Sequence, residues 1–248
     1  MQKLLSLTRK AISDYKMIED GDKIAVGLSG GKDSISLLAI LAAYKKFAPE
    51  KFDLLAINID LGFADTDQAQ VEATRKYCES IGVEFVVEHT RIFDIILERK
   101  EKSPCSLCSK MRRGALNSVA IAHGCNKLAL GHHADDILET FFLSFIYEGR
   151  ISTFMPVSHM DRSNVTLIRP FIYVEEKYLS GLSRRYDLPI IHNPCPMDKN
   201  TKREDVKQLV ASLDEKYGCK QRFLTALFHP ERNNLWDKMN GILKKQSD

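Results

Sequence analysis

The chain has 248 residues, of which 44% are hydrophobic, a length that suits one large α/β domain with or without a small appendage. Its net charge of +3 is too small to indicate nucleic-acid binding by itself. No apolar run reaches the roughly 18 residues that a transmembrane helix needs, so the composition argues against a membrane protein.

The first element expected along the chain is an amphipathic helix in residues 1–22. Leu4, Leu7, Ala11 and Tyr15 recur at helical spacing among charged residues. No small-residue cleavage site follows, so the segment does not have the pattern of a signal peptide. We therefore expect a cytoplasmic protein with no membrane partner.

Four short apolar segments, rich in β-branched residues, are predicted to be strands. They cover residues 23–28, 52–60, 83–89 and 127–133, and helical patterns at 33–47, 65–82 and 107–124 lie between them. This alternation predicts a doubly wound α/β fold with a parallel sheet. The carboxyl ends of its strands should bring the loops at Ser29, Asp60, His89 and His132 to one edge.

The pattern changes after residue 147. The next segment is irregular, with one strand expected at 165–169, and helices are expected at 175–186, 201–217 and 220–228. We divide the chain into an N-terminal helix (1–22), an α/β core (23–172) and a mostly helical C-terminal extension (173–248).

The most informative motif is SGGKDS, which directly follows the first predicted strand. It is not a Walker A loop, because Val26 and Asp33 stand where that motif requires glycine and serine or threonine. Its glycines still let the backbone approach a phosphate, the following helix offers free N–H groups, and the lysine and serines add donors. The predicted phosphate-binding residues are Ser29, Gly30, Gly31, Lys32, Asp33 and Ser34.

This motif resembles the pyrophosphate loop of the PP-loop ATPases. The resemblance implies that ATP is cleaved between its α- and β-phosphates, that AMP is transferred to a substrate oxygen, and that a nucleophile then displaces AMP. Two further segments fit this chemistry. Asp60 should lie near the nucleoside, and His132 should form hydrogen bonds with ATP. Asp135 and Asp136 lie together at a helix start and suit Mg²⁺, although spacing cannot decide between them.

Cysteines form a second group of candidate residues. Cys105 and Cys108 form a C-x-x-C pair, which is compatible with half a zinc site, a redox pair or two ligands of an iron–sulfur cluster. Cys195 would complete three thiolates, enough to hold a [4Fe–4S] cluster with one iron open, and Cys219 is the rival third ligand. The pair lies in a basic stretch, residues 99–113, with six basic residues and one acidic residue.

Taken in order, PCSLCSKMRRG, GHHADDILET, LIRPF with EEKYL, and LPIIHNPC make the chain similar to the tRNA 2-thiocytidine synthetase family over about residues 3–237. The resemblance implies a [4Fe–4S] cluster on Cys105, Cys108 and Cys195 that assists sulfur transfer to C2 of a cytidine in the tRNA anticodon loop. Three residues after the third ligand, where that family often has a further cysteine, this chain has Asp198.

The resemblance also assigns roles to charged residues, while the sulfur donor stays unidentified and a homodimer is an open alternative. Lys110, Arg112 and Arg113 would bind RNA, and the candidate catalytic residues are Lys32, Asp33, Arg112 and Asp135.

Two other functions remain alternatives. The same chemistry could act on a tRNA uridine and give 2-thiouridine, but the paired C-x-x-C zinc motifs usual at both ends of such enzymes are absent from this sequence. A non-catalytic protein that binds ATP and a metal is the other alternative, and the intact SGGKDS motif and the aspartate pair argue against it.

Overall fold

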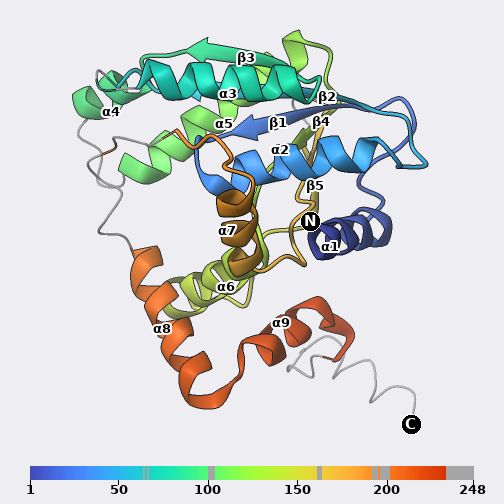
Figure 1. Cartoon of the computed structure of the whole chain (residues 1–248). Coiled ribbons are helices and arrows are strands. Elements are labelled where there is room, and N and C mark those ends of the chain that lie inside the picture. The colour runs from blue at the N-terminus through green and yellow to red at the C-terminus, as the bar shows by residue number, and fades with distance from the viewer. Residues whose placement is uncertain are drawn as a thin grey trace, which may run out of the picture.

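The protein is described here by a computed structural model that covers residues 1–63, 65, 67–99, 104–160, 164–191, 195 and 202–232. Its centre is a six-stranded sheet with the order β3-β2-β1-β4-β6-β5 (Figure 1). The strands are β1 (Lys23–Leu28), β2 (Asp53–Asp60), β3 (Glu84–His89), β4 (Lys127–Ala129), β5 (Val157–Met160) and β6 (Val165–Ile168).

Neighbouring strands pair in parallel from β3 to β6, which confirms the predicted parallel sheet, whereas β5 pairs antiparallel with β6. The strand β5 was not predicted, because this short edge segment is only partly buried and lacks a continuous apolar run. The predicted strand at 127–133 is shorter than expected. It ends at Ala129, so His132 and His133 lie beyond the strand.

Helices flank the sheet and occupy most of the described residues after residue 175. They are α1 (Gln2–Asp14), α2 (Lys32–Lys45), α3 (Gln68–Ser80), α4 (Ile92–Arg99), α5 (Pro104–Ala122), α6 (Ala134–Glu148), α7 (Glu176–Arg185), α8 (Lys202–Tyr217) and α9 (Lys220–Phe228), followed by the 3-10 turn η1 (Pro230–Arg232). The helix α4 was not predicted. None of the described helices is long and apolar enough to cross a membrane.

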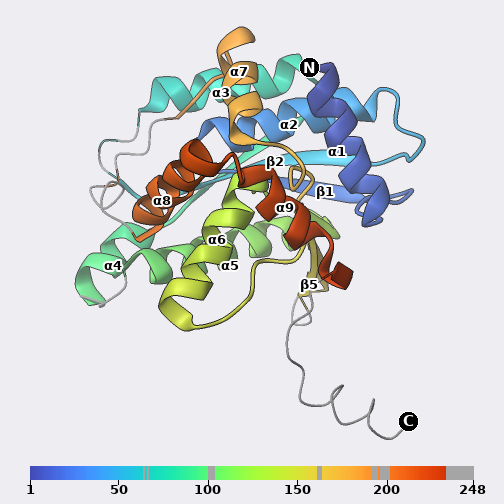
Figure 2. The same ribbon diagram turned by 90° about the horizontal axis from the view of Figure 1, so that it is seen from below.

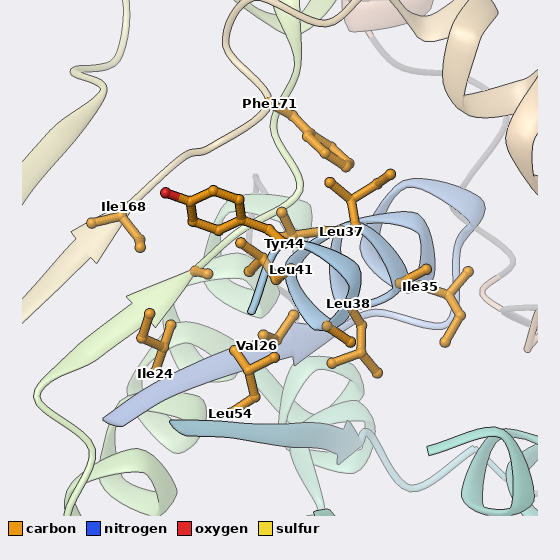
Figure 3. Close-up of a cluster of buried hydrophobic side chains, with 14 of the residues drawn as sticks. Ile24, Val26, Ile35, Leu37, Leu38, Leu41, Tyr44, Leu54, Ile168 and Phe171 are labelled. Carbon is orange, nitrogen blue, oxygen red and sulfur yellow. The ribbon is translucent and has the colours of Figure 1, made fainter. Parts of the chain in front are cut away.

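Two apolar layers hold the sheet between its helices. Ile24 and Val26 of β1 face α2, whose Leu38 and Leu41 point toward the sheet, while Ala25 belongs to the opposite layer with α4 and α5 (Figure 3). Every residue of α2 from 34 to 42 is buried, as expected of a helix that is apolar around its whole circumference. This packing places the first turn of α2 at the carboxyl edge of the sheet.

The C-terminal helices attach to this core in two ways. Helix α7 packs against α2, and Phe171 and Leu179, on either side of residue 172, belong to one hydrophobic core. Helices α8 and α9 instead pack on α6, where Leu138, Val206 and Leu224 form a smaller cluster (Figure 2). The division of the chain at residue 172 stays a prediction.

Candidate functional site

The loop between β1 and α2 is closed by its own hydrogen bonds. The Ser34 hydroxyl accepts a hydrogen bond from the Ser29 backbone N–H at 3.1 Å and donates one to the Gly31 carbonyl at 2.9 Å. The Ser29 hydroxyl donates a hydrogen bond to the Ser34 hydroxyl at 3.2 Å. Gly31 caps α2, so the loop holds the free N–H groups of the first helical turn at the sheet edge.

Gly30 and Gly131 are glycines because other segments pack directly on them. Gly30 has φ of +88°, and a Cβ there would lie 2.7 Å from the carbonyl oxygen of Ile191, whose N–H donates to the Gly30 carbonyl at 2.9 Å. A Cβ on Gly131 would lie 3.1 Å from the backbone of Asp33. The loop is therefore held between the segment that leads to Cys195 and the segment that leads to α6.

A cavity of about 230 Å³ lies beside this loop, between the N-terminal half of α5 and the start of α6. Its polar side chains are those of Ser29, Asp33, Ser34, Ser109, Arg112, Arg113, His132 and Asp136. Seven of these eight were sequence-predicted site residues, and Ser109 was not. Among the predicted residues that do not line this cavity are the charged residues Lys32, Asp60, Lys110 and Asp135.

Asp33 lines this cavity and has one buried carboxylate oxygen without a hydrogen-bond partner among the described residues. This oxygen is Oδ1, while Oδ2 lies 3.3 Å from the Lys32 ammonium. Burial raises the pKa of Asp33, and the nearby His133 and Lys32 oppose that rise. A buried oxygen without a partner is costly, so this position is suited to a polar ligand or a cation.

His132 is held as a neutral hydrogen-bond donor. Arg169 donates from Nε to His132 Nδ1 at 3.2 Å, which leaves the ring proton on Nε2. Burial lowers the pKa of His132 to about 4, so the ring is uncharged at neutral pH. Its ring centroid lies 5.1 Å from that of Phe154, which packs beside it.

The two neighbouring aspartates at the start of α6 face different surroundings. Asp136 Oδ2 accepts from the His133 backbone N–H at 2.9 Å, and Oδ1 accepts from Arg203 at 3.0 Å. Asp135 Oδ2 accepts from the Glu176 backbone N–H at 2.8 Å, and its Oδ1 pairs with Lys220. Asp136 lines the cavity beside the loop, whereas Asp135 lines a separate cavity of about 350 Å³ between α6, α8 and α9.

The side chain of Lys32 points toward α7. Its ammonium donates to Glu176 Oε1 at 2.8 Å, and the other oxygen of Glu176 accepts from Lys207 at 2.9 Å. Burial alone would lower the pKa of Lys32, but the hydrogen bond to Glu176 and the charges of Asp33 and Glu176 raise it, so it is a stable cation.

Four charged side chains in this region were not predicted as site residues: Arg203, Lys207 and Lys220 from α8 and α9, and Glu176 from α7. Glu176 lies in the EEKYL segment, so its motif was a signal, but nothing in local spacing identified the three cations.

The predicted cluster cysteines come from α5 and from the segment after α7. Cys105 and Cys108 lie on the first two turns of α5, one exposed and the other half-buried. Burial raises the pKa of the Cys108 thiol, Arg112 opposes that rise, and Cys195 and Cys105 add to it, so Cys195 lies near enough to act on Cys108. In the described part of the chain, no three or more His, Cys, Asp or Glu side chains are arranged as a metal site.

The three other predicted residues described here, Asp60, Lys110 and Cys219, lie on β2, on α5 and between α8 and α9. Asp60, at the end of β2, accepts from the Gly62 N–H at 3.0 Å and contacts His89 Nδ1 at 2.8 Å. Lys110 is exposed on α5. Cys219, the rival cluster ligand, is buried with its sulfur 3.3 Å from the Leu213 carbonyl oxygen, at the turn between α8 and α9.

The fold and this loop define a PP-loop protein, and the family model for the PP-loop domain matches residues 3–213. Two relatives are tRNA-cytidine(32) 2-sulfurtransferases. The one from Geobacter metallireducens is 38% identical over 234 residues, which is 92% of this chain and 90% of the relative. The one from Marinobacter nauticus is 38% identical over 92% of this chain and 76% of the relative. The chain therefore belongs to the tRNA-cytidine(32) 2-sulfurtransferase family within the PP-loop proteins, which confirms the resemblance expected from its motifs.

Solved structures agree with the fold. The U34-tRNA thiolase NcsA from Methanococcus maripaludis, solved with its [4Fe-4S] cluster, matches with a TM-score of 0.75 at 26% identity, over 96% of this chain and 80% of that one. NMN synthetase from Francisella tularensis matches with a TM-score of 0.51 at 12% identity, over 95% of both chains. The second match supports the α/β fold alone.

Proposed function

We propose that this protein is an ATP-dependent tRNA sulfurtransferase that adenylates the C2 oxygen of a cytidine in the anticodon loop and replaces that oxygen with sulfur. The observation that carries the proposal is the double use of helix α5. Its Arg112 and Arg113 line the cavity beside the SGGKDS loop, and its first two turns carry Cys105 and Cys108. One helix thus links a nucleotide loop, cations suited to RNA and a thiol pair.

ATP would bind at the start of α2. The loop, held in shape by Ser34, directs the N–H groups of the first helical turn toward the phosphates, where the helix dipole favours negative charge. Gly31 leaves the backbone open for close approach, since even a Cβ there would have its nearest contact at 3.6 Å. Arg112 and Arg113 would neutralise the charge that develops while the base oxygen attacks the α-phosphorus and pyrophosphate leaves.

Asp33 and Asp136 are the residues that fit Mg²⁺. Both line the cavity, and the unsatisfied Oδ1 of Asp33 is a ready oxygen donor. When bound, the ion would bridge phosphate oxygens and reduce their charge. Mg²⁺ uses one or two carboxylates and keeps several waters, so a larger cluster of acids is not needed. Asp135 fits less well, because it lines the separate cavity between α6, α8 and α9, away from the SGGKDS loop.

Cys105, Cys108 and Cys195 would hold the [4Fe–4S] cluster. Three thiols are the donor set that such a cluster uses when one iron stays open, and the charge of Cys195 is among the influences that raise the pKa of Cys108. The cluster, when bound, would supply the sulfur-transfer chemistry. Because burial raises the pKa of Cys108, that thiol should be protonated without metal and should ionise only on ligation.

Substrate recognition would use the basic side chains of α5. Lys110, Arg112 and Arg113 would contact the tRNA backbone, and the target base must leave its stack to reach the cavity. The neutral His132 would donate from Nε2 to a base or phosphate oxygen. A tRNA substrate supports a cytoplasmic location. Capture experiments would identify the sulfur donor, and a mass measurement in solution would test for the homodimer.

The proposal is tested by ATP turnover under anaerobic conditions. Protein reconstituted with iron and sulfide should carry about four irons per chain and release AMP and pyrophosphate only with tRNA. Failure to form AMP with any tRNA would favour the non-catalytic alternative. The match to a U34-tRNA thiolase keeps a uridine target as the second candidate, which the identity of the thiolated nucleoside decides.

A further inference from the structure

A single carboxylate joins the SGGKDS loop to the C-terminal helices. Glu176, the first residue of α7, accepts from Lys32 of α2 at 2.8 Å and from Lys207 of α8 at 2.9 Å, one through each carboxylate oxygen. Burial would raise the pKa of Glu176, but the two lysines together lower it to about 2. The group is therefore a full anion between two cations at any ordinary pH.

The ion pair with Glu176 holds Lys32, the only basic residue of the SGGKDS loop, outside the cavity. The Lys32 ammonium bonds to Glu176 and is not part of the cavity lining, whereas Ser29, Asp33 and Ser34 are. An anion that needs Lys32 must therefore compete with this carboxylate.

The second lysine makes such an exchange inexpensive. If Lys32 leaves, Glu176 keeps its ion pair with Lys207, so no half-buried charge is left without a partner. Lys32 in turn would exchange one anion for another. Lys32, Glu176 and Lys207 can thus take two arrangements, with Lys32 paired to Glu176 or to a bound anion, and every charge has a partner in both.

We propose that Glu176 is a positioning residue that holds Lys32 away from the phosphate site until the terminal phosphates of ATP replace the carboxylate. In this arrangement Lys207 is the counter-ion that stays with Glu176 and does not touch ATP. The inference rests on the proposed function, since it requires ATP to bind at the SGGKDS loop. It adds a competing anion from α7 and a role for α8 in ATP affinity.

The chain offers a matched control in the neighbouring acid. Glu175 pairs with Lys177 at 2.9 Å and with Lys220 at 3.4 Å, but it has no contact with Lys32. Glu176→Gln and Glu175→Gln each remove one negative charge from the same helix end, so a general electrostatic effect on ATP would be similar in both variants.

The test is the affinity of the holoenzyme for a non-hydrolysable ATP analogue with Mg²⁺, by titration calorimetry, together with KM values for ATP and tRNA. Glu176→Gln should bind the analogue about threefold more tightly, as expected for the loss of a partly exposed ion pair. Its KM for ATP should fall while its KM for tRNA stays constant. Glu175→Gln should bind the analogue as the unmodified protein does.

Lys207→Ala distinguishes the proposed role of Lys207, as the counter-ion of Glu176, from direct contact between Lys207 and phosphate. In the unmodified background it should weaken analogue binding, because Glu176 then depends on Lys32 alone. In the Glu176→Gln background it should have no effect. Equal weakening in both backgrounds would show that Lys207 touches phosphate, and would overturn the proposal.

Two further outcomes separate the inference from the function beneath it. If Glu176→Gln bound the ATP analogue as well as, or more weakly than, the unmodified protein, the proposed role of Glu176 would be refuted, although ATP turnover would still support the sulfurtransferase. Absence of both analogue binding and AMP formation in the unmodified protein, with any tRNA, would instead remove the ATP site, and the proposed function would fail with it.

Discussion

Gly30→Ala is a sharp test of how the loop is held. The residue has φ of +88°, and a side chain in this left-handed region costs roughly 1–2 kcal/mol. The added methyl would also lie 2.7 Å from the Ile191 carbonyl oxygen and 2.9 Å from its Cβ, a degree of overpacking that costs roughly 1–3 kcal/mol. Together the two effects should destabilise the protein by about 3 kcal/mol, a fall of about 6–12 °C in the midpoint of thermal unfolding.

Gly31→Ala is the matched control, because Gly31 has φ of −74° and a Cβ there would have its nearest contact at 3.6 Å, with the Ser29 hydroxyl. Thermal unfolding of both variants, followed by circular dichroism, measures the difference. Gly31→Ala should unfold close to the unmodified protein. If Gly30→Ala also did so, the contact between the loop and Ile191 would be wrong, and with it the link to the Cys195 segment.

The remaining predictions concern charges around the cavity. Asp136→Asn should slow AMP formation more than Asp135→Asn, and the reverse order would place Mg²⁺ on Asp135. Replacing Arg112 and Arg113 by alanine should reduce the salt dependence of tRNA binding, by about 0.7 in the log–log slope per lost contact, and an unchanged slope would remove them from the RNA surface. Burial raises the pKa of Glu139 from 4.5 to about 7, so the folded chain holds a proton that the unfolded chain releases. Stability should therefore fall as pH rises through this window, and Glu139→Gln should flatten that decline in thermal unfolding.

Local pattern was sufficient for the central layer of the fold. Buried strands such as residues 23–28 are continuous apolar runs, and their observed bounds agree with the prediction to within one residue at β1, β2 and β3. The misses are segments whose structure depends on partners far along the chain. The edge strand β5 exists because Val157–Met160 pairs with β6, and its own residues carry little strand signal.

In the candidate site, too, some features could be predicted from local sequence, whereas others depend on segments far along the chain. The loop and His132 could be placed near the carboxyl edge of the sheet because each lies at the end of a predicted strand, and Arg112, which lines the same cavity, belongs to the recognisable C-x-x-C segment. The different surroundings of Asp135 and Asp136 could not, because the direction of each side chain depends on α7 and α9. Lys207 likewise becomes part of the region only because α8 packs on α6, a contact between segments with no shared local pattern.

Nucleoside mass spectrometry of tRNA tests the central claim most directly. A strain lacking this protein would be complemented with the unmodified chain, with Cys195→Ser or with Cys219→Ser, and its tRNA digested to nucleosides. The account predicts 2-thiocytidine with the unmodified chain and with Cys219→Ser, and none with Cys195→Ser. Restoration of 2-thiouridine in place of 2-thiocytidine, or full activity of Cys195→Ser, would contradict it.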